Sequence, residues 1–182
     1  MQQSKILAEM TTHIPLCTHY EAKEVFVFGT VGIELKNELE KHKKESNIIF
    51  FDILELEKLE NKSADVVILS DINLELKLVA NIFRVLKDDG LFVAPSKSYF
   101  QNFDILKKDL TLLGNNFWIA MPYSFSHSTM ILGSKKYHPT ADLNLHRADF
   151  LENMEYYSSD IHLASFVFPA KIHKELTGFS KR

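Results

Sequence analysis

The chain has 182 residues, the length of one ordinary domain, and it is 46% hydrophobic and 25% charged, as typical globular proteins are. Its net charge of −3 argues against nucleic acid or an anionic membrane as a partner, because both attract excess basic charge. No apolar run approaches the roughly 20 residues that cross a bilayer, and a single cysteine excludes an internal disulfide. We therefore expect a cytoplasmic protein with one domain over residues 1–182.

The first half of the chain alternates helical and strand patterns. Residues 2–12 predict a helix within a lead-in segment, residues 1–20, and Pro15 is expected to end it or to start a turn. Three short, continuous apolar runs follow, which is typical of parallel strands that helices cover on both faces. These buried strands are expected at residues 25–28, 47–51 and 65–69, and the helices after them at residues 33–44, 53–60 and 74–86.

The second half adds a fourth strand, a helix and a strand pair. Gly90 is expected to stop the preceding helix as its C-terminal glycine, just before the strand at residues 91–94. A short loop separates the last two apolar runs, so they are expected to pair antiparallel at one edge of a six-stranded sheet. These runs are residues 117–123 and 129–134. A helix is expected before them at residues 101–113, and two more are expected in a helical tail at residues 135–182, namely 159–165 and 169–176.

Strand and helix alternation followed by an antiparallel pair predicts an α/β fold of the methyltransferase-like Rossmann type, with a doubly wound, mostly parallel sheet. In such sheets ligands bind beyond the carboxyl ends of the strands. Here that edge carries the segment from Gly29 to Gly32, then Asp52, then the segment from Ser70 to Asn73. The histidines and the cysteine show no metal-ligand spacing, so no metal site is expected.

Four segments carry a family resemblance. They are EMTTHIPLCTH at residues 9–19, LKDDGLFVA at 86–94, SKKYHP at 134–139, and YYSSDIHLASFVFP at 156–169. Over nearly its whole length the chain resembles the spermidine synthases, or polyamine aminopropyltransferases. That family normally has a small N-terminal β-domain that contributes to its dimer, so the resemblance implies a divergent member without this domain.

The resemblance also implies an activity and its ligands. The family transfers an aminopropyl group from decarboxylated S-adenosylmethionine to putrescine, which yields spermidine and methylthioadenosine. Because the sulfonium of the donor already makes it electrophilic, no cofactor is expected beyond this co-substrate. The expected partners are small amine and nucleoside ligands and further copies of the chain, as a dimer or other homo-oligomer.

Three residues are candidates for binding the donor. Gly29 and Gly32 lie in the segment that resembles the family's glycine-rich turn, where the backbone approaches the donor, but Gly32 stands where the family has an acidic residue. A tight strand-to-helix turn explains the same glycines. Asp52 follows the second strand and is expected to bind the ribose or the adenine, or else to cap the next helix. One strand and one helix of the family pattern are absent between Gly29 and Asp65.

The residues expected to bind and deprotonate the amine lie mainly in the segment after the third strand. Aminopropyl transfer requires an amine without its proton, so a carboxylate base is needed. The family places two aspartates where this chain has Ser70 and Asn73, which leaves Asp71 as the expected base and Asn73 as a substrate contact. Both could instead cap the following helix. Glu9 and Tyr123 are further candidates for the amine site, and Tyr123 could equally lie on a hairpin surface.

The replacement of the family's aspartates favours a second hypothesis, in which the chain is a non-catalytic relative that acts as a binding or subunit-interaction module. Acidic side chains converging in a cleft beyond the first and third strands would support the enzyme, and a shallow or filled cleft the module. The first helix also carries an apolar stripe that needs a cover, and the face left by the absent β-domain is expected to be covered by a partner subunit, by the first helix or by an altered dimer. The members of the stripe are Ile6, Leu7, Met10 and Ile14.

Overall fold

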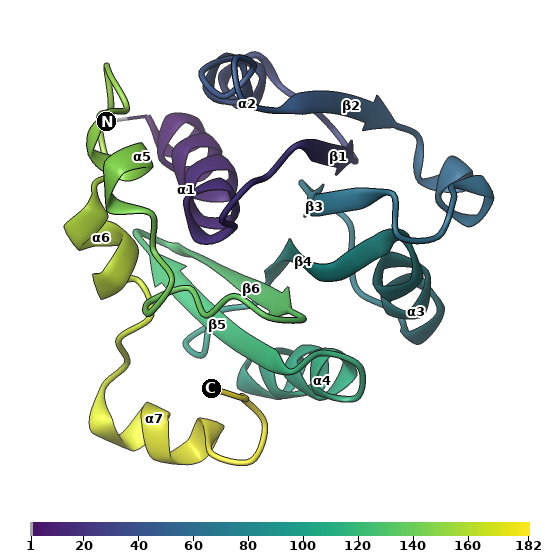
Figure 1. Cartoon of the computed structure of the whole chain (residues 1–182). Coiled ribbons are helices and arrows are strands. Elements are labelled where there is room, and N and C mark those ends of the chain that lie inside the picture. Colours follow the sequence, from purple (N-terminus) through teal and green to yellow (C-terminus); the bar gives the residue numbers. More distant parts are fainter. Residues whose placement is uncertain (1) are drawn as a thin grey trace.

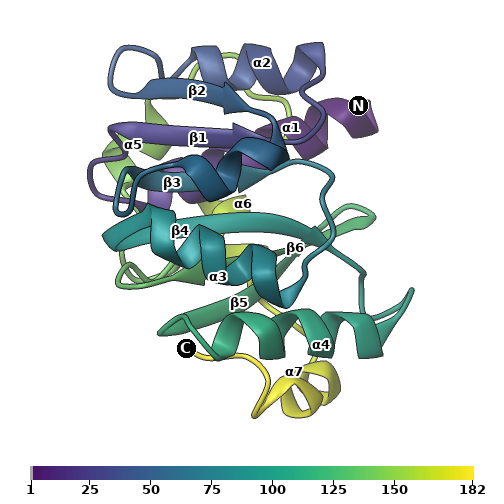
Figure 2. The same ribbon diagram turned by 90° about the vertical axis from the view of Figure 1, so that its right-hand side faces the viewer.

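Six strands form one sheet in the order β2-β1-β3-β4-β6-β5 in the computed structural model, which describes residues 2–182 (Figures 1 and 2). The strands are β1 (Glu24–Phe28), β2 (Asn47–Phe51), β3 (Ala64–Leu69), β4 (Leu86–Ser96), β5 (Ile119–Phe125) and β6 (Ser128–Ser134). The first four are parallel, whereas β6 runs antiparallel to both β4 and β5. The predicted fold class, the six strands and the antiparallel pair at one edge are therefore confirmed.

Helices cover both faces of the sheet. They are α1 (Gln3–Thr18), α2 (Ile33–Glu40), the 3-10 helix η1 (Ile53–Lys58), α3 (Leu76–Val85), α4 (Phe103–Gly114), α5 (Leu145–Asp149), α6 (Ser159–Ala164) and α7 (Ala170–Leu176). Helices α1 and α2 lie on one face, and α3 and α4 on the other (Figure 1). None of the helices within residues 2–182 is long and apolar enough to cross a membrane.

The two faces explain the continuous apolar runs. In β1, Val25 and Val27 join the core under α1 and α2, whereas Phe26 and Phe28 join the core under α3 and α4. Every residue of β3 is buried. Such strands have no solvent face, so they carry no polar alternation.

Helix α1 differs from its prediction because it continues through Pro15 to Thr18. Pro15 cannot donate the usual backbone hydrogen bond, but the helix is buried almost throughout from Ile6 onward, and tertiary packing outweighs that loss. Arg147 supports the end of the helix, because its Nη1 donates to the carbonyl oxygens of Leu16 at 2.6 Å and His19 at 2.9 Å. The prediction that Pro15 ends this helix was wrong.

The apolar stripe of α1 is covered within the chain. Ile6, Met10 and Ile14 are buried in the core of residues 2–182, and only Leu7 is exposed, at 36%. This stripe therefore gives no argument for a partner subunit.

Two further expectations were wrong for geometric reasons. Gly90 does not end a helix, because α3 ends at Val85 and β4 begins at Leu86. Instead, Gly90 lies close to the neighbouring strand, where a Cβ would be 3.1 Å from the carbonyl oxygen of Asp65. Strand β2 is not buried, because it is an edge strand, and Phe50 is 44% exposed. Helix α2 also ends earlier than expected, and α5 was not predicted.

Candidate functional site

The carboxyl ends of β1 and β3 meet at a tight crossing of two loops. Gly29, directly after β1, has φ +99°, a conformation that glycine adopts without strain. A Cβ at this position would collide with the side chains of Ser70 and Asp71, which follow β3. The Asp71 carboxylate accepts hydrogen bonds from the Thr30 backbone N–H at 3.0 Å and from the Ser70 hydroxyl at 3.4 Å. Gly29 is therefore required by the close approach of these loops.

A cleft of about 620 Å³ opens beside this crossing, between the first half of α1 and the start of α2. Leu7, Ala8 and Thr11 form the α1 wall. The opposite wall consists of Thr30, Gly32, Ile33, Glu34, Leu35, Ser70 and Asp71. This is the place where open α/β sheets bind ligands, beyond the carboxyl ends of neighbouring strands.

Two carboxylates, those of Asp71 and Glu34, border the cleft. Hydrogen bonding by Thr30, and then by Ser70, holds the pKa of Asp71 below its ordinary value, so this carboxylate is ionised at neutral pH. Glu34 was not among the predicted site residues. The signal that could have identified it is its position in the first turn of α2, two residues after Gly32. Both carboxylates lie on the wall opposite α1, and the ionised Asp71 carboxylate suits a cationic ligand.

The glycines of the turn divide between two roles. Gly32 is the N-cap residue of α2 and borders the cleft, with an ordinary φ of −72° and open space around its Cβ position. Gly29 shapes the loop crossing and does not line the cleft.

Asp52 lies at the end of β2, outside the cleft lining. Its carboxylate accepts the backbone N–H of Leu54 at 2.9 Å, and the Glu55 carboxylate accepts the backbone N–H of Asp52 at 2.8 Å, which completes a capping box for η1. Of the two roles that the sequence left open, capping is the one that the side chain performs here.

Replacing Asp52 should separate these two roles. Asp52→Ala should lower the free energy of unfolding by about 1 kcal/mol, because the cap is lost, whereas Asp52→Asn should preserve stability because asparagine also caps helices. Urea unfolding of both variants tests this expectation. Equal losses in the two variants would contradict the capping role.

The loop after β3 leads Asn73 away from the cleft that Asp71 lines. Asn73 borders a different depression, of about 420 Å³, between η1 and α3. The structure therefore does not bring Asn73 into the cleft that Asp71 lines.

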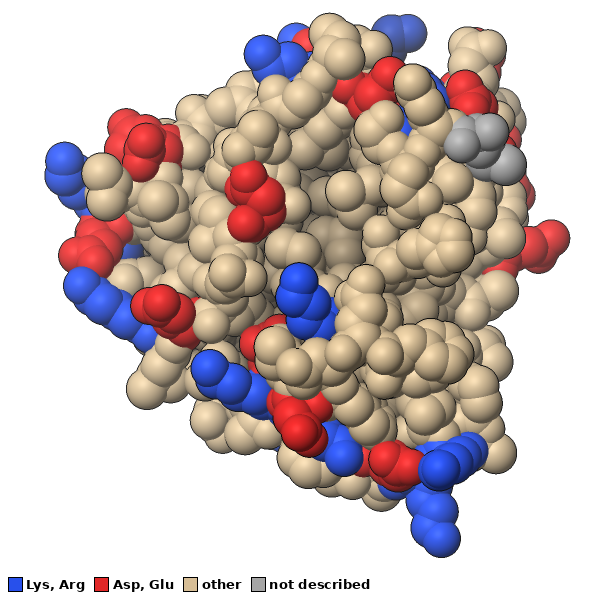
Figure 3. Space-filling view, turned by 180° about the vertical axis from the view of Figure 1, so that it is seen from behind, with Lys and Arg blue, Asp and Glu red and all other residues tan. Residues whose placement is uncertain are grey.

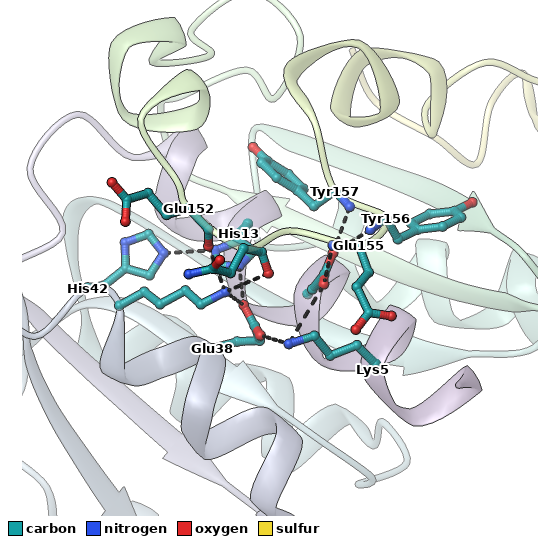
Figure 4. A network of polar contacts seen from close by, with 11 residues as sticks. Lys5, His13, Glu38, His42, Glu152, Glu155, Tyr156 and Tyr157 are labelled. Carbon is teal, nitrogen blue, oxygen red and sulfur yellow. Dashed lines mark hydrogen bonds and ion pairs between the residues drawn. The ribbon is translucent and has the colours of Figure 1, made fainter. Parts of the chain in front are cut away.

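Glu9 and Tyr123 are interior residues, contrary to the expectation that they contact a substrate. The fully buried Glu9 carboxylate accepts backbone N–H groups from Glu155 at 2.9 Å, Tyr156 at 2.8 Å and Tyr157 at 2.7 Å (Figure 4). Tyr123 is also fully buried, and its hydroxyl donates to Met130 Sδ at 3.3 Å. Both side chains are occupied by the protein itself, so they leave no surface for an amine.

A second polar network joins α1 to α2 (Figure 4). The buried Glu38 carboxylate contacts Lys5 Nζ at 2.5 Å, Lys41 Nζ at 2.8 Å and His13 Nε2 at 2.9 Å. His13 Nδ1 lies 2.9 Å from His42 Nε2. Since an ionised carboxylate only accepts, His13 Nε2 must donate to it, and neutral His13 then accepts a hydrogen bond from His42.

Burial alone would raise the pKa of Glu38, but hydrogen bonds from His13, Lys41 and Lys5 outweigh it and lower that pKa to about 2. Burial and the positive charge nearby lower the pKa of His42 to about 3. The network therefore holds one negative charge and uncharged imidazoles at neutral pH. It fixes the two helices that flank the cleft.

Charges on the outer surface do not suggest a polyanion partner. Figure 3 shows acidic and basic side chains interspersed around the rim of one face, with mostly uncharged surface between them. On the described part of this face no single-sign patch gathers, which agrees with the net charge of −3.

The curated proteins that resemble this chain in sequence include several polyamine aminopropyltransferases. No protein-family model matches the chain. A polyamine aminopropyltransferase of Helicobacter pylori strain G27 is 26% identical over 199 residues, which cover 93% of this chain and 76% of the relative. One of Methanocaldococcus jannaschii is 26% identical over 219 residues, which cover 93% and 75%.

Solved structures show the same fold. Spermidine synthase from Thermotoga maritima matches with a TM-score of 0.80 at 22% identity, covering 95% of this chain and 74% of the other. A spermidine synthase in complex with the transition state analogue AdoDATO matches with a TM-score of 0.82 at 20% identity, covering 95% and 75%.

Proposed function

Since the chain is a divergent relative of the polyamine aminopropyltransferases, we propose that its cleft binds a small amine together with an adenosine thioether or sulfonium, and that aminopropyl transfer there is slow. The observation that carries this proposal is the ionised Asp71 carboxylate on the cleft wall, held by the Thr30 N–H beyond the ends of β1 and β3. A fixed negative charge at this place suits the ammonium of an amine and the sulfonium of a donor.

In the proposed reaction the amine nitrogen bonds to the propyl carbon attached to the sulfonium. The carbon–sulfur bond breaks, its electron pair stays on sulfur, and methylthioadenosine leaves as a neutral thioether. The amine loses one proton, which passes to Asp71 and then to water. At pH 7 well under one amine in a hundred is free, because its pKa of about 10 resembles that of lysine.

Slow transfer follows from the chemistry of the base. General-base help is worth roughly 10²–10⁴ in rate, and it is greatest when the pKa of the base lies near the working pH. The pKa of Asp71 is lowered, so this carboxylate orients a cation better than it accepts a proton. Ser70 and Asn73 supply no carboxylate at the two positions where the family resemblance places aspartates.

A binding module without catalysis is the second candidate. It is favoured by the capping bonds of Asp52 and by the position of Asn73 in another depression. This candidate retains the cleft and its ligands but predicts no methylthioadenosine release at all.

Replacing Asp71 tests the proposal. By calorimetry, Asp71→Asn should weaken putrescine binding about two- to fivefold, because one partly exposed ion pair is lost, and should leave methylthioadenosine binding nearly unchanged. It should also abolish any methylthioadenosine release from decarboxylated S-adenosylmethionine and putrescine. Glu75→Gln is the matched control, since Glu75 lies four residues away and borders the other depression.

Two results would contradict the proposal. Failure of the wild-type chain to bind either ligand would remove the cleft as a ligand site. Turnover at ordinary enzyme rates, about 10 per second, would show that the site is a fully competent catalyst. Binding without any turnover would favour the non-catalytic module.

A further inference from the structure

The opposite end of the sheet, at the amino ends of β3 and β4, brings together three potential metal ligands. His19 caps the C-terminus of α1, Asp65 lies at the start of β3, and Asp89 lies near the start of β4. One ligand atom from each lies within 4.8 Å of the other two. The distance between His19 Nε2 and Asp89 Oδ1 is 3.9 Å.

His19 is the unusual member of this cluster. Its side chain is 2% exposed, and neither ring nitrogen has a hydrogen-bond partner among the described residues. A buried polar group without a partner is costly and calls for an explanation such as an ion. A neutral imidazole nitrogen has a lone pair to offer a metal ion.

The two carboxylates are held by their other oxygen atoms. Asp65 Oδ2 accepts backbone N–H groups from Lys23 at 3.0 Å and Glu24 at 2.7 Å, and it also contacts Lys87 Nζ at 2.9 Å. Asp89 Oδ2 accepts the Tyr137 hydroxyl at 3.1 Å. Outer hydrogen bonds of this kind orient the ligands of metal sites.

We propose that His19, Asp65 and Asp89 bind a divalent transition-metal ion, with Zn²⁺ as the preferred metal. The two carboxylates and Lys87 together carry one net negative charge, and Arg147, which donates to the His19 carbonyl oxygen, is paired with Glu45, so a cation would balance the site. One imidazole nitrogen with two carboxylate oxygens suits Zn²⁺ better than Mg²⁺, which prefers oxygen alone.

The geometry leaves room for coordination and for entry. Ligand distances of about 2.0–2.2 Å require the three donor atoms to close by a fraction of an ångström to about 1 Å. The Asp89 side chain is 36% exposed, so an ion can enter from solvent and retain water at its open positions. The site lies far along the strands from Asp71 and serves to join the end of α1 to the sheet.

Sequence spacing could not reveal this site. The three ligands come from three different elements, and no pair of them is close enough in sequence to form a ligand motif. They meet only because α1 ends against the amino ends of β3 and β4.

Titration of the tag-free, chelator-treated chain with ZnCl₂ alone tests the proposal. We expect one equivalent to bind, and Asp89→Asn to weaken it about 10- to 100-fold. Asp88→Asn should bind as the wild type does, because the neighbouring Asp88 side chain is 80% exposed and pairs with Lys62. Zinc at 100 times its dissociation constant should raise the melting temperature by roughly 5 °C or more in the wild type.

X-ray absorption at the zinc edge supplies a second readout that does not depend on a variant. One nitrogen and oxygen donors at about 2.0–2.2 Å are expected, and the nitrogen contribution should disappear in His19→Gln if that variant folds. Binding that is unchanged in Asp89→Asn, or no saturable binding below about 100 µM, would overturn the proposal. These results are independent of putrescine binding in the cleft.

Discussion

Lowering the pH from 7 to 4.5 is expected to remove about 5 kcal/mol from the free energy of unfolding, which equals the whole stability of the least stable domains. The reason is two buried, uncharged histidines. Burial lowers the pKa of His162 to about 4, while its Nε2 contacts the Pro139 carbonyl at 3.0 Å and its Nδ1 the Tyr157 hydroxyl at 2.9 Å. Burial and neighbouring positive charge lower the pKa of His42 to about 3.

The direction follows from proton binding. Below pH 6.5 the unfolded chain protonates both histidines, whereas the folded chain does not until about pH 4 or 3. The stability is therefore complete above pH 6.5 and falls by about 1.4 kcal/mol per pH unit for each histidine as the pH decreases. Urea unfolding at half-unit intervals from pH 7 to 4.5 measures this slope.

A matched pair of variants assigns the slope to buried histidines. His162→Gln should lower the slope between pH 6.5 and 4 by about 1.4 kcal/mol per unit. His173→Gln, at an exposed position in α7, should leave the slope unchanged. A slope that is equal in all three proteins would contradict the assignment.

Replacing Glu38 with glutamine is expected to cost about 3 kcal/mol of stability at neutral pH. Glu38 is fully buried, and its carboxylate is the only negative charge among its contacts with Lys5, Lys41 and His13. Removing one partner from a buried charge network is far more costly than losing an exposed ion pair. Urea unfolding at pH 7 is the measurement.

Glu40→Gln provides the control on the same helix. The Glu40 side chain is 53% exposed and pairs with Lys43 on the surface, so its replacement should cost less than about 1 kcal/mol. Equal losses for the Glu38 and Glu40 variants would show that the network contributes no more than a surface pair. The Glu38 variant should also loosen the cleft, because the network joins the two helices that form its walls.

The fold could be read from the sequence because its strands are covered on both faces. The continuous apolar runs of β1 and β3 identify buried strands, and the short loop before β6 identifies the antiparallel pair. The predictions at Pro15 and Gly90 were wrong, because they rested on local rules for helix ends that leave tertiary packing out of account. Burial of α1 and the close approach of β4 to Asp65 override those rules.

The site could be predicted only in part. Asp71, Gly29 and Gly32 follow strand ends or open a helix, so the parallel sheet brings them to one edge. Glu9 and Tyr123 were assigned by resemblance alone, and their environments depend on the distant tail and on Met130. No local pattern reveals that a glutamate in a helix will receive three backbone N–H groups from residues near the other end of the chain.

This arrangement also sets the order in which the molecule can be completed during synthesis. The Glu9 carboxylate is made 146 residues before its first partner, the Glu155 N–H, and the Thr11 hydroxyl 119 residues before Met130. At about 5–20 residues per second, the Glu9 carboxylate therefore waits roughly 7 to 30 s for the backbone N–H groups that pair with it. Helix α1 is therefore completed late, although its contacts with Glu38 of α2 become possible much earlier.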